Sequence, residues 1–139
     1  MTDYDSINIS YEDVSCLVVQ SPNYYGLVEN WKTANSILPK DSSTNLIAVS
    51  DPMSFGILEN PGRCGADIYV GEGQVFGNHQ GFGGPYLGLI SAKEEFTRKM
   101  PGRIVGRTID SNNNEGFVLT LQTREQHIRR ERATSNICT

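Results

Sequence analysis

The sequence predicts an α/β fold in which a mostly parallel β-sheet lies between helices. Two short apolar runs, CLVVQ at 16–20 and NLIAVS at 45–50, have the length and continuous apolar character of buried parallel strands. Between them, the apolar residues of LVENWKTANSIL at 27–38 recur at helical spacing, and Pro39 follows as a stop signal. A strand, a helix and a second strand in this order predict a right-handed βαβ unit whose strands end at the same edge of the sheet.

Two further strands and a short helix are expected after this unit. The run DIYV at 67–70 predicts a third strand, and YLGLIS at 86–91 predicts a fourth. The residues AKEEFTRKM at 92–100 predict a short helix, because Pro101-Gly102 follows them as a terminator.

A β-hairpin and a basic segment close the chain. The strands RIVGRTID at 103–110 and FVLTLQ at 117–122 flank the turn-forming stretch SNNNEG, and residues 123–134 are compatible with a helix. Residues 124–132 hold four Arg and two Glu, a local charge of +2 in a chain of net charge −4. This segment could bind a phosphate, a carboxylate substrate or an acidic partner, or it could be a solvated helix face. The negative net charge and the lack of interleaved aromatic residues argue against a nucleic-acid partner.

Length and composition indicate an ordinary globular protein. With 139 residues, 37% of them hydrophobic and 20% charged, the chain has room for one domain with one core. No apolar run approaches the roughly 18 residues that a membrane-spanning helix needs. The N-terminus is acidic, whereas a secretory signal would be basic. We therefore expect a cytoplasmic protein that does not contact a membrane.

Neither a disulfide framework nor a metal site is indicated. The three cysteines, Cys16, Cys64 and Cys138, are an odd number without CxxC spacing, so we expect reduced thiols. His79 lies in a predicted loop without a second ligand nearby, which argues against a metal.

A glycine-rich stretch, GEGQVFGNHQGFGGP at 71–85, follows the third predicted strand. Its six glycines allow positive φ angles and the close approach of a ligand or of another backbone. No helix pattern opens at the last glycine of GxGxxxG, and no Gly-Lys-Ser/Thr follows, so the stretch is neither a dinucleotide fingerprint nor a P-loop.

Five stretches of the chain carry a family resemblance: SPNYYG, DIYVGEGQ, FGGPYLG, MPGRIVGRTID and LTLQTREQHIRRERATSNICT. In this order they resemble the P-protein, or glycine decarboxylase, of the glycine cleavage system. The resemblance is to the N-terminal half of that enzyme, called subunit 1 where the enzyme is split. It covers residues from about 15 to 139, whereas residues 1–14 show nothing recognisable and are treated as an N-terminal leader.

The resemblance implies a fold and an activity. Residues 15–139 are expected to be a fragment of the large domain of a fold-type I enzyme that depends on pyridoxal phosphate (PLP). The family's chain extends beyond this segment on both sides, so we expect the middle of a larger subunit. In the family, glycine is decarboxylated on PLP, and the aminomethyl group passes to the lipoyl arm of a carrier protein.

The resemblance also indicates which half of the enzyme this chain is. An enzyme of this class needs a lysine that binds PLP as a Schiff base. In the catalytic half this lysine precedes a glycine-rich GGP, and counting back from Pro85 reaches Gln74 or Val75. The lysines of this chain are Lys32, Lys40, Lys93 and Lys99, so residues 41–92 contain none. We therefore interpret the chain as the half without the PLP lysine, with no catalytic residue and no covalent cofactor of its own.

Such a half would complete an active site across an interface. The possible contributors are Gln74, Arg124, His127, Arg130, Thr134, Ser135 and Asn136. The arginines could contact the cofactor region or form interface salt bridges, which is the commoner case. Thr134, Ser135 and Asn136 could hydrogen-bond a ligand, or they could cap a following helix.

Other residues have two interpretations each. Asp51 has the setting of the aspartate that faces the PLP pyridine nitrogen, but without a local lysine it is expected to be vestigial or a cap. Asn23, Tyr24 and Tyr25 follow a strand, where α/β folds place ligand loops, although the tyrosines could equally pack in a core or an interface. Cys138 could lie near the substrate channel or be buried, which is the more frequent state.

The expected partners are the PLP-bearing half or subunit of the same enzyme and the lipoyl carrier protein, and the isolated chain is expected to be inactive. One alternative is an interaction domain that docks the lipoyl carrier protein without a catalytic role. Another is an independent α/β enzyme that uses Arg and His for acid and base chemistry. The sequence lacks GxSxG and informative carboxylate pairs, which argues against that last alternative.

Overall fold

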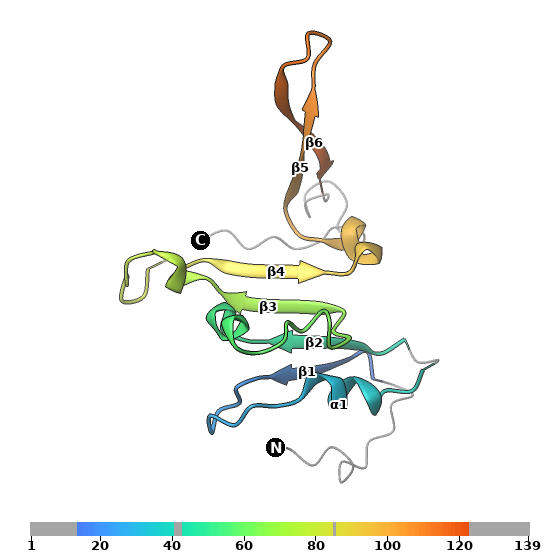
Figure 1. Ribbon diagram of the computed structural model, residues 1–139, viewed down its shortest axis with the longest axis vertical. Helices are drawn as coiled ribbons and strands as arrows, with labels where there is room; N and C mark the ends of the chain where they lie inside the picture. Colours follow the sequence, from blue (N-terminus) through green and yellow to red (C-terminus); the bar gives the residue numbers. More distant parts are fainter. Residues whose placement is uncertain (1–13, 41–42, 85, 123–139) are drawn as a thin grey trace. The chain divides into compact units, whose positions relative to one another are not determined.

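The computed structural model describes residues 14–40, 43–84 and 86–122 (Figure 1). The chain forms two compact units, Met1–Lys93 and Glu94–Thr139, which are described separately. The first unit contains a four-stranded sheet, and the second contains a β-hairpin.

The sheet of the first unit has the strand order β1-β2-β3-β4. Strands β1 (Cys16–Gln20), β2 (Asn45–Val49) and β3 (Ile68–Glu72) run parallel, while β4 (Gly88–Ala92) pairs antiparallel with β3. All three parallel strands point to the same side in Figure 1. The predicted α/β fold with a mostly parallel sheet is therefore confirmed.

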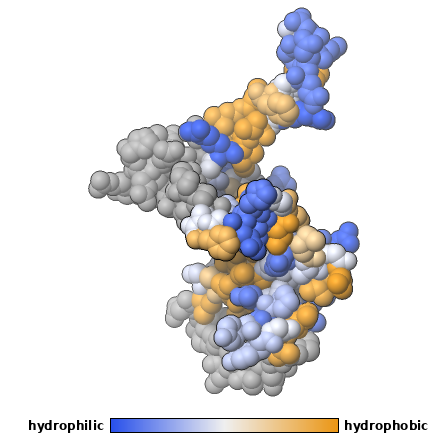
Figure 2. Space-filling model, turned by 90° about the vertical axis from the view of Figure 1, so that its left-hand side faces the viewer, coloured by the Kyte–Doolittle hydropathy of each residue, from blue (hydrophilic) through white to orange (hydrophobic). Residues whose placement is uncertain are grey.

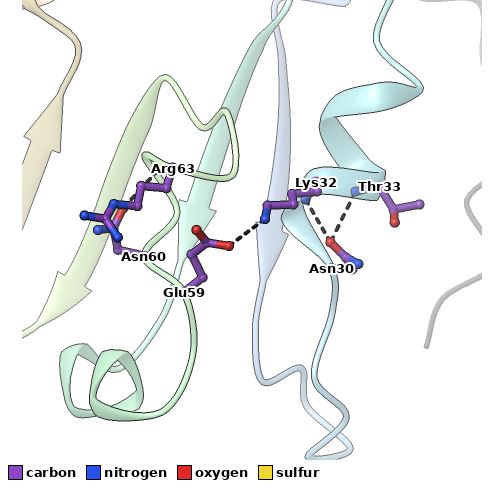
Figure 3. A network of polar contacts seen from close by, with 6 residues as sticks. All are labelled: Asn30, Lys32, Thr33, Glu59, Asn60 and Arg63. Atoms are coloured by element: carbon purple, nitrogen blue, oxygen red, sulfur yellow. Dashed lines mark hydrogen bonds and ion pairs between the residues drawn. The ribbon is translucent and has the colours of Figure 1, made fainter.

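Helix α1 (Trp31–Ser36) connects β1 to β2, as the βαβ prediction required, but it is shorter than the predicted 27–38. Asn30 is extended and caps the helix, because its side-chain oxygen accepts hydrogen bonds from Lys32 N (2.9 Å) and Thr33 N (3.3 Å) (Figure 3). The residues before Asn30 belong to the loop that leaves β1. Helical spacing alone does not reveal this competing loop.

The core of the first unit lies where α1 packs on the sheet. Its buried members are Val19, Trp31, Ala34, Leu46, Ala48, Cys64 and Ala66. The indole of Trp31 donates a hydrogen bond to Val19 O at 3.2 Å, so its polar atom is satisfied inside the core. Trp31, Phe55 and Tyr69 form a row of edge-to-face ring contacts with centroid distances of 6.5 and 5.2 Å.

Strand β3 is longer than the predicted 67–70 and continues through Gly71 and Glu72, which pair with β4. Glycine is required at position 71, since an added Cβ would lie 2.1 Å from Tyr69 Oη and 2.7 Å from Ser50 O. The glycine-rich stretch therefore begins inside the sheet rather than after it.

Three short 3₁₀ helices complete the described elements. They are η2 (Pro52–Gly56), η3 (Gln74–Phe76) and η4 (Glu94–Lys99). The short helix predicted at 92–100 is a 3₁₀ helix over the narrower range Glu94–Lys99, because β4 continues to Ala92 and leaves only eight residues before Pro101. Segments this short often adopt the tighter 3₁₀ form.

The second unit contains the predicted hairpin, β5 (Arg103–Ile109) and β6 (Glu115–Gln122). In its turn the Asp110 carboxylate accepts hydrogen bonds from the backbone of Asn112 and Asn114, both at 2.8 Å. The hydrogen bonds from Asn114 and then Asn112 lower the pKa of Asp110. The helix predicted at 123–134 lies outside the described residues.

None of the helices within the described residues has the length and apolar character that crossing a bilayer requires.

Leu46 provides a test of this core. Its side chain is fully buried in β2, so Leu46→Ala should lower the free energy of unfolding by about 2–5 kcal/mol. Ile57→Ala, at a side chain that is 94% exposed, should change it by less than about 0.5 kcal/mol. Denaturant unfolding followed by the fluorescence of Trp31, the single tryptophan, measures both; equal effects would contradict the assigned core.

Candidate functional site

Three loops meet at the edge of the sheet where the parallel strands end. SPNYYG follows β1, Asp51 and η2 follow β2, and the glycine loop from Gly73 onward follows β3. Figure 1 shows these connections on one side of the sheet. In α/β folds this carboxyl edge is the usual place for a ligand.

A cavity of about 490 Å³ opens at this edge. It is lined by residues from the carboxyl ends of the three parallel strands and from the loops that follow them: Gln20 and Pro22 at β1, Val49, Ser50 and Asp51 at β2, and Val70, Gly71, Glu72 and Val75 at β3. We call it the carboxyl-edge pocket. Among the described residues, this lining carries two carboxylates and no Lys, Arg or His, so the described part of the lining is negatively charged.

Asp51 forms one acidic side of the pocket and caps η2. Its Oδ1 accepts a hydrogen bond from Met53 N at 2.8 Å, and its carbonyl accepts one from Ser54 N at 3.1 Å. Burial and the negative charge of Asp51 raise the pKa of Tyr69, whose hydroxyl donates to Ser50 O at 3.0 Å. The capping interpretation of Asp51 thus agrees with the structure.

Glu72 forms the other acidic side and anchors the glycine loop. Its Oε1 accepts hydrogen bonds from Gln74 N at 2.9 Å and from Leu87 N at 2.8 Å. Gln74, a predicted site residue, donates from Nε2 to Asn78 O at 2.6 Å. The side chain of Gln74 therefore stabilises its own turn, and the neighbouring Val75 lines the pocket.

The loop after β1 presents Tyr24 and Tyr25 to solvent on a fixed backbone. The rings are 93% and 82% exposed and stand edge to face with centroids 5.3 Å apart. Asn23 Oδ1 accepts hydrogen bonds from Tyr25 N (2.9 Å) and Leu27 N (3.1 Å), and Gly26 supplies the positive φ of +78° that the turn needs. Neither tyrosine belongs to the core that the described residues of this unit form.

Glu29 ties this loop to the body of the unit. Its side chain is buried and accepts a hydrogen bond from Asn23 Nδ2 at 2.7 Å. The fully buried Ser21 hydroxyl donates to Glu29 O at 3.1 Å and accepts from Glu29 N at 3.0 Å. These contacts hold the two ends of the loop together.

A second cavity, of about 370 Å³, lies near the opposite ends of the strands. Asp67, immediately before β3, and Lys93, immediately after β4, line it and form an ion pair at 2.5 Å. Asp67 also accepts a hydrogen bond from Leu46 N at 2.7 Å. The carboxylate therefore joins three segments of the unit, which indicates a structural role.

The remaining predicted site residues belong to the last part of the sequence. The following residues lie outside the described part of the chain: Arg124, His127, Arg130, Thr134, Ser135, Asn136 and Cys138. Across the described ranges, no group of three or more His, Cys, Asp or Glu side chains could hold a metal ion. Burial raises the pKa of the Cys64 thiol, whereas Cys16 is exposed.

Glu72 and Glu29 are residues of the candidate site that sequence reasoning missed. Glu72 follows DIYVG directly, so a longer third strand would have placed it at the carboxyl edge. Glu29 stands within an apolar helical pattern, where an unexplained acidic residue could have signalled a buried hydrogen-bond network.

Fold and site together define an α/β domain with a pocket at the carboxyl edge of its sheet. All 139 residues match the family model described as glycine cleavage system P-protein. The chain belongs to this family.

Individual relatives agree with this assignment. The chain is 54% identical over 128 residues to the "Probable glycine dehydrogenase (decarboxylating) subunit 1" of Chloroherpeton thalassium, covering 92% of this chain and 29% of the relative. It is 56% identical over 126 residues to the protein of the same name from Chlorobium limicola, covering 91% and 28%. The chain therefore spans less than a third of the length of these curated relatives.

A solved structure is similar as well. The crystal structure of glycine decarboxylase (P-protein) of the glycine cleavage system, in inhibitor-bound form, matches with a TM-score of 0.80 and 46% sequence identity. The match covers 92% of this chain and 29% of that chain.

Replacing Asn23 tests whether the tyrosine loop is held as described. Asn23→Ala removes two acceptor contacts to backbone amides and one donor contact to Glu29, each worth about 0.5–1.5 kcal/mol. Amide hydrogen exchange at Tyr25 and Leu27 should accelerate by about tenfold or more. Asn78→Ala, at an exposed asparagine of the glycine loop, is the control and should leave both rates unchanged. Unchanged exchange in Asn23→Ala would show that the loop does not depend on this side chain.

Proposed function

We propose that this chain is part of a glycine dehydrogenase (decarboxylating), in the half that does not hold PLP, and that it completes the active site across an interface with the PLP-bearing half. Two observations carry the proposal. The described lining of the carboxyl-edge pocket is acidic, and the sequence has no lysine between residues 41 and 92. Family membership and the names of the relatives support the parent activity.

The carboxyl-edge pocket does not fit PLP. A phosphate group needs cations or free backbone N–H donors, whereas the described residues of this lining contribute Asp51 and Glu72 and no basic side chain. Gln74 and Val75 stand where the catalytic half would carry its lysine, and neither can form a Schiff base. Asp51, which would have faced the pyridine nitrogen, accepts the Met53 amide instead.

Lys32, Lys93 and Lys99 are no better placed to form a Schiff base with PLP. Lys32 forms an ion pair with Glu59 at 2.6 Å (Figure 3). The hydrogen bond to Glu59 and the charge of Glu59 raise the pKa of Lys32. A Schiff-base lysine must instead be available as a neutral amine. Lys93 pairs with Asp67, and Lys99 lies 5.9 Å from the ring centroid of Phe96.

The proposal assigns the chemistry of glycine to the partner half and gives this chain a supporting role. Residues 15–139 would form a fragment of the large domain, and residues 1–14 a leader. The lipoyl carrier protein would be the second partner of the assembled enzyme. Gln74, Arg124, His127, Arg130, Thr134, Ser135 and Asn136 would contribute to the interface or the active site.

A cofactor-binding experiment tests the proposal. The purified chain is mixed with PLP, its visible spectrum is recorded, and it is then reduced with borohydride and examined by mass spectrometry. We expect no Schiff-base absorption band and no adduct on Lys32, Lys40, Lys93 or Lys99. The PLP-bearing subunit treated in the same way is the positive control. A stoichiometric adduct on any of the four lysines would refute the assignment.

A further inference from the structure

The glycine loop begins where the pairing of β3 with β4 is interrupted. It extends from the carboxyl edge of the sheet, which is the side that Figure 2 turns toward the viewer. The two strands pair up to Glu72, which lies opposite Gly88. One step further, Gly73 N still donates a hydrogen bond to Leu87 O at 2.7 Å. In a regular antiparallel ladder these two residues would also form the reverse bond, from Leu87 N to Gly73 O.

The reverse bond is absent here, and both of its atoms bind elsewhere. Leu87 N donates to Glu72 Oε1 at 2.8 Å. Gly73 O accepts a hydrogen bond from Phe76 N at 3.0 Å, which closes the first turn of η3. The side chain of Glu72 thus takes the place of the Gly73 carbonyl in the ladder, and that carbonyl is free to start the turn.

The same carboxylate oxygen also holds the other end of the loop. Glu72 Oε1 accepts a hydrogen bond from Gln74 N at 2.9 Å, in addition to the bond from Leu87 N. Hydrogen bonds to an ionised acceptor are roughly twice as strong as those between neutral groups. Two such bonds from one side chain can therefore compete with one further pair of the backbone ladder.

Two hydrogen-bond arrangements are open to the start of the loop. In the bent arrangement seen here, η3 forms, Gln74 Nε2 donates to Asn78 O at 2.6 Å, and Val75 lines the carboxyl-edge pocket. In the extended arrangement, Leu87 N would donate to Gly73 O, the ladder would gain one pair, and η3 would lose its first bond. Gln74 and Val75 would then continue β3 and leave their present positions.

We propose that Glu72 is a positioning residue, because its carboxylate selects the bent arrangement and so fixes where the glycine loop presents Gln74 and Val75. The consequence for glycine turnover rests on the proposed function, in which this loop helps to complete the active site. The hydrogen bonds concerned lie within the segment from Glu72 to Asn78 and at Leu87. They therefore do not depend on what covers the carboxyl edge in the complete subunit.

Two substitutions of Glu72 in the full-length subunit that contains this chain test the selection of the bent arrangement. Glu72→Ala removes the acceptor of both amides, whereas Glu72→Gln keeps a side-chain oxygen of the same reach. In Glu72→Ala, amide hydrogen exchange at Gln74 and Phe76 should accelerate by about tenfold or more, because η3 opens. Exchange at Leu87 should stay slow, because Gly73 O replaces the lost acceptor.

Two variants serve as controls for these exchange rates. Glu72→Gln should retain the exchange rates of the unchanged protein, because its amide oxygen can accept both hydrogen bonds. Glu95→Ala, at an exposed acidic residue of η4, should leave the same rates unaltered. Denaturant titration of each variant measures how much of the subunit is folded.

Glycine decarboxylation tests the positioning role itself. Each variant subunit is combined with the separately purified PLP-bearing subunit from the same organism, and kcat and KM for glycine are determined per folded enzyme. Glu72→Ala should lower kcat by about tenfold or more without weakening the association of the subunits, and Glu72→Gln should restore most of this loss. A side chain that only stabilised the fold would lower the amount of folded enzyme and leave kcat per folded enzyme unchanged.

The possible outcomes separate the inference from the proposed function. If exchange at Leu87 accelerates as much as exchange at Gln74 and Phe76, the extended arrangement does not form and the inference is wrong. If kcat is unchanged in Glu72→Ala, or if Glu72→Gln loses as much activity, the positioning role is overturned while the proposed function stands. If the unchanged subunits together do not decarboxylate glycine, the proposed function fails, and the exchange rates still decide whether Glu72 selects the bent arrangement.

Discussion

Parallel pairing of β1, β2 and β3 is the constraint on which the candidate site depends. Because parallel strands share one direction, the three loops that follow them must leave at one edge. The pocket, the tyrosine loop, η2 and the glycine loop lie at one edge of the sheet for this reason. The buried contacts of Leu46, Ala48 and Trp31 hold the pairing in place, so the site depends on a core that contains none of its polar groups.

The same local device orders each loop of this edge. A side-chain oxygen accepts a hydrogen bond from the backbone N–H two residues later: Asn23 from Tyr25, Asp51 from Met53, and Glu72 from Gln74. Asn30 and Asp110 act in the same way at α1 and in the hairpin turn. At the pocket, two of these oxygens belong to carboxylates. Asp51 and Glu72 therefore both order their loops and make the pocket acidic.

The strands were largely predictable because their signals are local. Short apolar runs gave β1 and β2, and alternation around SNNNEG gave the hairpin. The ends of elements were less predictable where a non-local contact decides them: Gly71 stays in β3 because Tyr69 and Ser50 leave no room for a side chain. The acidic pocket could not be predicted either, since Asp51 and Glu72 are far apart in sequence and meet only through strand pairing. The resemblance and the missing lysine could be read directly from the residues.

The central claim is that this half contributes an interface and does not hold the cofactor. A structure of the assembled enzyme with PLP, determined by cryo-electron microscopy, tests it most directly. The account predicts PLP on a lysine of the other half and no PLP in the carboxyl-edge pocket of this chain. PLP density inside the carboxyl-edge pocket would contradict it.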